Sequence, residues 1–467
     1  MSIAAHRWQV PAAFLACAVA SLPWLVMSSP LAPLTVAGGV VVLLIAIHRP
    51  LLVCIGFVAF SLFRLHEAFP FLMPLQPLLG LAALTAVALV YNALAGRIEA
   101  VWPAEIRLFV AFFILVTIGS VFAISPALSF EFWTGGFVKI GLMTLALAWL
   151  PRTKDDFHLV ARVIAISGLL VAAVAISNKL NGTNLVEGTR VTIGLQMTSI
   201  LSDPNDLAFL LLTTLSFSIA LLTGRTGWTN RIIGAACVPA VLLAIVYTQS
   251  RGAVLGVLTV FAAYGLLFVR SKTVLIVACI IGAMALYLAM GISERMSRVA
   301  PAEGFDASAA DRLDFWITAL KAAALRPLTG VGLANFSWFN YIQTGQDMTT
   351  HNTWLQVLAE TGIPGLALFV LMVARAFRTS LRAHRILSAA EIRSPVQPVA
   401  YGLVAAIAGF CTAGLFLSQG FTWSIYIMVA LAAAVGRYVD ENTRMTVRTG
   451  ASHPRGAIHD MAPYRGN

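Results

Sequence analysis

The chain has 467 residues, of which 59% are hydrophobic and only 11% are charged, and its formal net charge is +11. Because a soluble domain carries roughly 25% charged residues, this composition excludes a soluble globular protein and indicates an integral membrane protein. Apolar runs of about 20 residues, the length that spans a bilayer as a helix, recur without the short alternating strands of a membrane barrel. The predicted fold class is therefore all-α, a polytopic membrane bundle of about 12 to 14 transmembrane helices.

Fourteen apolar runs are expected to form the spans, although the short early runs and the tight turn at 248–252 leave twelve as an alternative. The first run follows Arg7 without a convincing cleavage site, so we expect it to remain as a span. In chain order the predicted spans are 10–27, 32–47, 51–69, 75–95, 106–123, 134–150, 158–178, 205–223, 231–248, 252–269, 273–291, 353–376, 398–418 and 421–437.

These spans divide the chain into four regions. Residues 1–291 hold the N-terminal transmembrane helices, and residues 292–352 form a long loop with short amphipathic helices. The C-terminal transmembrane helices follow at 353–437. The tail, 438–467, is polar and contains Gly and Pro, so we expect it to be disordered.

The distribution of charge predicts the orientation of the bundle. With the N-terminus in the cytoplasm, 21 of the 31 Lys and Arg residues lie on the cytoplasmic side, whereas 12 of the 20 acidic residues lie on the outer side. The two sides then carry net charges of +13 and −2, a positive-inside pattern with both termini cytoplasmic. The basic excess is thus a topology signal, and no nucleic-acid partner is expected. The loop 292–352 faces outward in this orientation.

One helix is predicted to begin at the outer face in the stretch SDPNDLAF. Asp203 is the cap, Pro204 takes the first helical position and Asp206 lies in the first turn. A helix N-terminus carries partial positive charge and suits a phosphate, although most capped helices bind no ligand.

A second outer helix is predicted to begin in HNTWLQVLAETGIPGL. Thr353 and Gln356 match a capping box, which leaves His351 and Asn352 just outside the helix. A histidine at a membrane boundary, beside a second helix N-terminus, is a candidate for proton transfer to or from a bound substrate.

Three arginines share the outer face: Arg190 in EGTRVTIGLQ, Arg251 in TQSRGAVLG and Arg312 in SAADRLDFWITALKAAALRP. Arg251 lies between two apolar runs, a position that costs several kcal/mol unless the charge is paired or faces water. Snorkelling or a structural ion pair is the alternative for Arg251, and an ordinary solvated loop charge is the alternative for Arg190.

The segment around Arg312 has the pattern of an amphipathic helix. Ser308 and Asp311 form a start signal and Pro327 a stop. Its apolar residues at helical spacing are Leu313, Ile317, Leu320 and Ala324, and its charged side holds Asp311, Arg312, Asp314 and Lys321. We expect this helix to lie on the outer membrane surface with its charged side toward water, and a simple cover over the bundle is the alternative.

These residue types predict a chemistry. Arginine forks and helix N-termini suit a pyrophosphate, and an imidazole with a pKa near 6.5 suits abstraction of a proton. ATP and nucleotide sugars are absent outside the cytoplasm, so a lipid-linked pyrophosphate is the expected reactant. The outer loops contain no Asp-x-Asp pair and no His/Cys cluster, so we expect no metal and no cofactor. Asp311 and Asp314 are more typical of solvated charges.

The stretches TQSRGAVLG, RLDFWITALKAAALRPLTGVGLANF and HNTWLQVLAETGIPGL together resemble the O-antigen ligase/polymerase superfamily of bacterial inner-membrane glycosyltransferases, which includes WaaL-type ligases and Wzy-type polymerases. DPNDLAFLLL is similar to stretches of ligase-like members. The resemblance covers about residues 185–370. It implies metal-independent transfer of a glycan from undecaprenyl pyrophosphate to an acceptor hydroxyl at the periplasmic face, with lipid A–core oligosaccharide as the acceptor of a ligase.

The resemblance also implies roles for residues at matching positions. His351 would be the base, and Arg190 and Arg312 would bind the pyrophosphate, with Arg251 supporting that site. The long loop varies within the superfamily, so Arg295, Arg298 or Arg326 is the alternative to Arg312. Asp203 and Asn352 are further candidates for substrate binding.

Other functions compete with the favoured ligase. A polymerase joins repeat units with the same chemistry, and a protein O-oligosaccharyltransferase modifies Ser or Thr. The chain lacks the larger C-terminal extension of many enzymes of that last kind. A transporter or flippase of lipid-linked sugar is the rival from another class. It is disfavoured because only Lys139 lies well inside a span and no internal repeat is evident.

Overall fold

The computed structural model describes residues 32–75, 77–194, 200–224, 227–289, 305–389 and 394–448. Within these ranges ten helices are long and apolar enough to cross a membrane, and a pair bent by 107°, Gly38–His48 with Pro50–Leu62, makes eleven if it forms one span. The shorter apolar helix α20 (Gln397–Ala413) joins them. The chain is therefore a multi-pass helical membrane protein, which confirms the predicted fold class.

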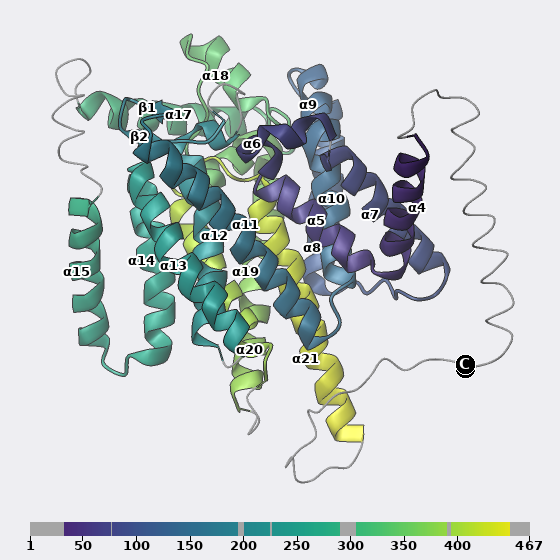
Figure 1. The fold of residues 1–467 in the computed structure, drawn as a ribbon. Coiled ribbons are helices and arrows are strands. Elements are labelled where there is room, and N and C mark those ends of the chain that lie inside the picture. The colour runs from purple at the N-terminus through teal and green to yellow at the C-terminus, as the bar shows by residue number, and fades with distance from the viewer. Residues whose placement is uncertain are drawn as a thin grey trace, which may run out of the picture.

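The helices follow the predicted spans in order (Figure 1). The first half contains α4 (Ala32–His48), α5 (Pro50–Leu62), α7 (Pro77–Leu94), α8 (Ala104–Val121), α10 (Val138–Trp149) and α11 (Lys154–Leu180). The second half contains α12 (Pro204–Thr223), α13 (Trp228–Thr248), α14 (Arg251–Phe268), α15 (Lys272–Ala289), α19 (Thr353–Ala389), α20 and α21 (Trp423–Arg448). Shorter elements are α6 (Leu65–Ala68), α9 (Pro126–Phe132), β1 (Leu185–Val186), β2 (Arg190–Val191), α17 (Phe305–Leu325) and α18 (Phe336–Thr344), 3-10 turns at Pro70–Leu75 and Ile200–Ser202, and a π-helical turn at Trp133–Phe137.

Three predictions about the spans need comment. The predicted first span, 10–27, lies outside the described residues. The span predicted at 51–69 is too long, because α5 ends at Leu62 and Arg64 then adopts a left-handed conformation with φ +46°. The boundary at 437 is also wrong, since α21 continues to Arg448 through the start of the segment predicted to be disordered.

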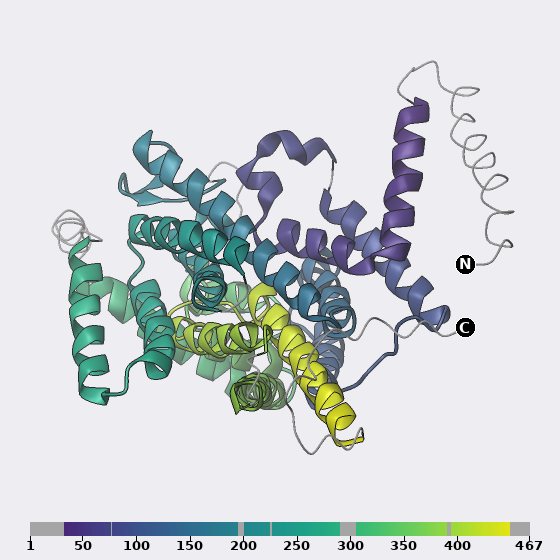
Figure 2. The same cartoon turned by 60° about the horizontal axis from the view of Figure 1, so that its bottom comes forward.

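The core lies around α12 and α21. Leu207–Leu221 of α12 is buried without interruption, and so is the stretch 424–436 of α21. Small side chains let neighbouring helices approach closely, and this close packing holds helices together inside a membrane. By contrast, α15 has no buried residue and packs against α14, and α4 and α15 stand at opposite edges of the bundle in Figures 1 and 2.

The segments predicted to face outward gather at one end of the bundle, the top of Figure 1, which we call the site end. It holds the hairpin of β1 and β2, the helices α6, α17 and α18, and the starts of α12, α14 and α19. The loop 414–422 between α20 and α21 also lies here, because the backbone N–H of Thr353 donates to the carbonyl of Gly414 at 2.7 Å.

Helix α19 is broken close to the site end. Gly362 has φ +71° and ψ −172°, so the backbone leaves the helix at this residue. An intact helix would bond the N–H of Ile363 to the carbonyl of Ala359, and Pro364 has no N–H to offer the carbonyl of Glu360. Each unsatisfied backbone group costs several kcal/mol inside a bilayer.

The turn that follows α17 satisfies all three of these groups. Val331 N–H donates to the Ala359 carbonyl at 2.8 Å, and Gly332 N–H donates to the Glu360 carbonyl at 3.0 Å. Ile363 N–H donates to the carbonyl of Pro327 at 2.8 Å. The stretch 327–332, the glycine-bearing turn PLTGVG, therefore completes the hydrogen bonding of the broken helix, and it fixes where α17 ends.

Replacing Gly330 with Ala is expected to lower the unfolding temperature substantially. Its φ of +65° already costs an L-residue roughly 1 kcal/mol, and a Cβ there would lie 2.3 Å from the carbonyl carbon of Glu360. Gly345→Ala is the matched control, because Gly345 has φ +77° but an added Cβ meets no atom within 4 Å. Thermal unfolding in detergent measures both, and equal losses would contradict the role assigned to the Gly330 contact.

Candidate functional site

Arg190 on β2 joins two neighbouring helices at the site end. Its side chain is buried, Nε donates to the carbonyl of Thr248 at 3.0 Å, and Nη2 donates to Oδ1 of Asn205 at 2.7 Å. Glu187 lies 3.6 Å from Nη1. The guanidinium thus connects the end of α13 with the start of α12, and the alternative of a solvated loop charge is wrong.

The turn between α13 and α14 presents Arg251 beside this hairpin. Gln249 has a left-handed backbone with φ +52°, and its Oε1 accepts a hydrogen bond from the Thr189 hydroxyl at 2.9 Å. Arg251 is the first residue of α14, and its side chain is exposed at the site end. Hydrogen bonds from Thr189 and Arg190 therefore hold the hairpin of β1 and β2 against the turn between α13 and α14.

The start of α12 confirms the predicted cap. Oδ1 of Asp203 accepts the backbone N–H groups of Asn205 at 2.6 Å and Asp206 at 3.2 Å, and Pro204 takes the first helical turn. Asp203 itself is exposed. A carboxylate already occupies the N–H groups of this helix, so the helix start is a poor seat for a second anion.

The start of α19 is capped differently from the prediction. Oδ1 of Asn352 accepts the N–H groups of Trp354 at 3.0 Å and Leu355 at 3.1 Å, so Asn352 is the cap. The predicted capping box of Thr353 and Gln356 is wrong, because both side chains bond to the loop 414–422. The Thr353 hydroxyl donates to the carbonyl of Leu417 at 2.6 Å, and Oε1 of Gln356 accepts the Gly420 N–H at 3.0 Å.

His351 lies at the centre of the candidate site. It is half-buried, directly before the cap of α19, and its backbone is left-handed with φ +48°. Burial lowers the pKa of the imidazole below its usual value, the nearby Arg312 guanidinium lowers it further, and the Asp203 carboxylate raises it in part. The three residues predicted from separate stretches therefore interact electrostatically, and the lowered pKa favours the neutral form of the imidazole.

Helix α17 brings Arg312 to this position. The Phe315 ring lies 6.3 Å from the imidazole of His351, centroid to centroid, and Nε1 of Trp316 donates to the carbonyl of Thr350 at 3.1 Å. Neither aromatic residue was among the predicted site residues. Their signal was only their position three and four residues after Arg312, one helical turn along.

The predicted faces of α17 are partly revised. The side chains of Leu313, Ile317 and Leu320 are exposed on the surface of the protein, as expected for a helix that lies at a membrane surface. A different stripe packs against α19 and α18; its buried members are Phe315, Thr318, Ala319, Ala322 and Ala323. Asp314 and Lys321 are exposed, and the side chain of Asp311 lies outside the described residues.

The loop 414–422 links the start of α19 to the start of α12. The Gln419 N–H donates to the Thr353 hydroxyl at 3.1 Å, and Nε2 of Gln419 donates to Oδ1 of Asp206 at 2.6 Å. Asn352 also reaches the loop, through Nδ2 to the Leu415 carbonyl at 3.2 Å. This one loop thus fixes His351 relative to Asp203. The span predicted at 398–418 is too long, because α20 ends at Ala413 and residues 414–418 belong to this loop.

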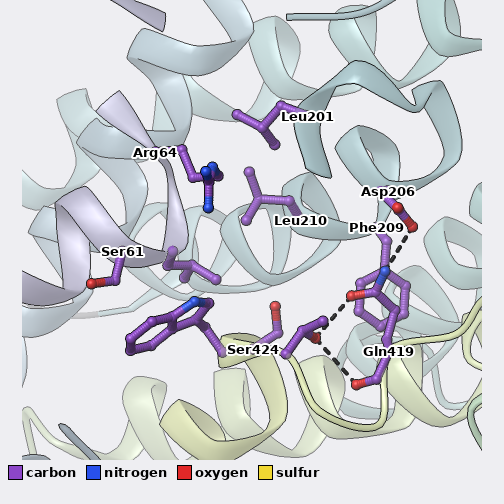
Figure 3. Close-up of a pocket in the computed structure, with 11 residues that line it drawn as sticks. Ser61, Arg64, Leu201, Asp206, Phe209, Leu210, Gln419 and Ser424 are labelled. Atoms are coloured by element: carbon purple, nitrogen blue, oxygen red, sulfur yellow. Dashed lines mark hydrogen bonds between the residues drawn. The ribbon is translucent and has the colours of Figure 1, made fainter. Parts of the chain in front are cut away.

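A small cavity lies beside this link, between the end of α5, the start of α12 and the loop (Figure 3). Arg64 and Ser61 line one side and Asp206 with Gln419 the other. Its volume of about 20 Å³ has room for a water molecule but not for a sugar ring.

Comparisons with known proteins find similarity over part of the chain. Residues 235–370 match the model of the family described as O-antigen ligase. The chain is 30% identical over 210 residues to the exopolysaccharide production protein ExoQ of Rhizobium meliloti (strain 1021). The part of the chain that these comparisons match is thus similar to the O-antigen ligase/polymerase superfamily.

The match to the superfamily is partial. The similarity to ExoQ covers 40% of this chain and 46% of the relative, so the chain spans about half the length of the curated relative it matches. The segment matched by the O-antigen ligase model contains Arg251, Arg312 and His351, whereas Arg190 and Asp203 precede it. The hairpin and the start of α12 are therefore joined to the matched segment by the contacts of Arg190 and Gln419.

The electrostatic setting of His351 gives a prediction for this site. Arg312→Gln is expected to raise the pKa of His351 toward its ordinary value, because a nearby positive charge is lost. Asp203→Asn is expected to lower the pKa further, because a negative charge is lost while Asn still caps α12.

The pH dependence of diethyl pyrocarbonate labelling at His351, followed by peptide mass spectrometry, measures both shifts. Only the neutral imidazole reacts, so the labelling midpoint should move to higher pH in the first variant and to lower pH in the second. Shifts in the same direction in both variants would contradict the arrangement.

Proposed function

We propose that this protein is a metal-independent glycosyltransferase that moves an O-antigen glycan from undecaprenyl pyrophosphate to a hydroxyl of lipid A–core oligosaccharide. The observation that carries the proposal is the half-buried imidazole of His351 near the Arg312 guanidinium, whose charge together with burial lowers the pKa of that imidazole. A neutral imidazole accepts a proton, and an adjacent guanidinium binds and stabilises a pyrophosphate leaving group. This transfer requires a base for the acceptor hydroxyl and, close to it, a positively charged group for the pyrophosphate.

In the proposed reaction, His351 takes the proton of the acceptor hydroxyl as its oxygen attacks the anomeric carbon of the glycan. The bond from that carbon to the pyrophosphate oxygen breaks, and undecaprenyl pyrophosphate leaves with the electron pair. Arg312 and Arg251 hold the pyrophosphate, and the buried Arg190 contributes positive charge from a fixed position. Asp203 and Asn352 contact the substrates at the edge of the site.

The proposed location is the bacterial inner membrane, with both termini in the cytoplasm and the site end in the periplasm. The charge distribution supports it, since 21 of the 31 Lys and Arg residues lie away from the site end in the predicted topology. Lipid-linked pyrophosphate is then available in the outer leaflet, directly at the level of the site.

The similarity to ExoQ favours a second candidate within the same chemistry. That relative is described as an exopolysaccharide production protein, so the acceptor here would be another lipid-linked glycan, as in a polymerase. A protein O-oligosaccharyltransferase shares the donor but takes a Ser or Thr hydroxyl. A transporter of lipid-linked sugar would have no need of the base.

The acceptor is tested with purified full-length protein, a defined undecaprenyl-pyrophosphate glycan and purified lipid A–core oligosaccharide. Glycan on the lipid A–core, seen by gel and mass spectrometry and retained in excess chelator, is the expected result. A ladder of lengthened donor without that product would make the protein a polymerase. Activity restored only by added divalent cation would contradict metal independence and implicate Asp311 and Asp314.

His351→Ala is expected to retain donor binding and to lose turnover by a factor of about 10² to 10⁴, the usual contribution of a positioned base. His48→Ala is the matched control, because His48 is exposed at the end of α4 away from the site end. Product formation and donor affinity are measured for both. Unchanged turnover in His351→Ala would refute the assignment of the base.

Arg312→Ala is expected to weaken donor binding by about tenfold or more, because one charge-assisted contact is lost. Arg312→Lys should restore little of this affinity if the contact uses the two-pronged guanidinium fork. Lys321→Ala removes an exposed positive charge from the same helix and serves as control. Full recovery in Arg312→Lys would show that only the charge matters.

A further inference from the structure

The first turns of the three helices that begin at the candidate site differ in one respect. In α12 the Asp203 carboxylate takes two backbone N–H groups, and in α19 the Asn352 amide oxygen does the same. In α14 the N-cap residue is Ser250, and no side chain caps the helix. Its first turn contains no acidic residue, and it begins with Arg251.

Ser250 makes this first turn unusual. A serine at the N-cap ordinarily accepts a hydrogen bond from the backbone N–H two or three residues later. Here the residue is 1% exposed, yet its hydroxyl has no partner among the described residues. A buried hydroxyl without a partner is unfavourable, so the position favours a ligand that accepts hydrogen bonds.

The loop 414–422 places this helix start next to the base. A Cβ on Gly252 would lie 3.1 Å from Cβ of Phe416, so the glycine lets the loop approach the first turn of α14. The neighbours of Phe416 in the chain, Leu415 and Leu417, accept hydrogen bonds from Asn352 and Thr353. The same three residues of the loop therefore contact α14 and hold the chain that follows His351.

We propose that the first turn of α14, together with the Ser250 hydroxyl, binds a phosphate group of the lipid-linked pyrophosphate. The backbone N–H groups, the hydroxyl and the Arg251 guanidinium are all donors, and no acidic residue lies in this turn. The other two helix starts are already capped, one of them by a carboxylate. This subsite rests on the proposed function, because it assigns a further residue, Ser250, to the donor site of the transferase.

The decisive variant is Ser250→Asp. An aspartate is a good N-cap, so it is expected to leave the unfolding temperature unchanged or to raise it. The same carboxylate occupies the N–H groups and repels the ligand, so the dissociation constant for undecaprenyl pyrophosphate should rise by about a hundredfold. If Ser250 had only a structural role, Ser250→Asp would not weaken binding while leaving the unfolding temperature unchanged or higher.

Two further variants complete the test. Ser250→Ala removes the hydroxyl without adding charge, and we expect binding about tenfold weaker with no loss of stability. Gln346→Glu adds the same charge as Ser250→Asp in the exposed loop after α18, and we expect unchanged binding. Affinities are measured with full-length protein in detergent, with undecaprenyl pyrophosphate that carries no glycan as the probe.

Competition identifies the group that binds. Displacement of the probe by inorganic pyrophosphate, but not by phosphatidylglycerol, supports the subsite, and displacement by phosphatidylglycerol alone would overturn it. Wild-type affinity in both Ser250 variants would overturn the subsite while leaving the transferase intact. If the wild-type protein fails to bind the probe and transfers no glycan, the proposed function itself fails.

Discussion

The need to satisfy every backbone hydrogen-bonding group inside a bilayer controls how this site is built. Helix α19 is broken at Gly362, and the turn 327–332 supplies the missing partners of Ala359, Glu360 and Ile363. Because this turn directly follows α17, its position determines where α17 ends. The distance between Arg312 and His351 therefore depends on these hydrogen bonds, which lie about ten residues after His351 in the chain.

The same end of the molecule balances opposite charges around one imidazole. Arg312 and burial favour the neutral form of His351, and Asp203 favours the protonated form. In the proposed reaction the imidazole is neutral before the proton transfer and positive after it, so it would benefit from a carboxylate held near it but separate from it. The loop 414–422 maintains this separation, because it bonds to Thr353 on one side and to Asp206 on the other.

Hydropathy and charge predicted much of the fold, because each span is a local property of the chain. The Asp203 cap was also predicted, since a cap involves residues two or three positions apart. The predicted capping box at Thr353 is wrong because the Thr353 hydroxyl donates to the carbonyl of Leu417, 64 positions away in the chain. A local sequence pattern cannot reveal a partner so far away in the chain. For the same reason the sequence did not predict that Ser250, Phe315 and Gln419 lie at the site.

The left-handed backbone of His351 has a consequence for a test of the proposed reaction. Among non-glycine residues, Asn, Asp and His adopt positive φ most readily. Asparagine at position 351 would thus remove the imidazole and still follow the φ of +48° that leads into the α19 cap. If His351 is the proposed base, such a protein would hold the proposed donor and acceptor together without reaction, and it would offer a route to an experimental structure of the filled site.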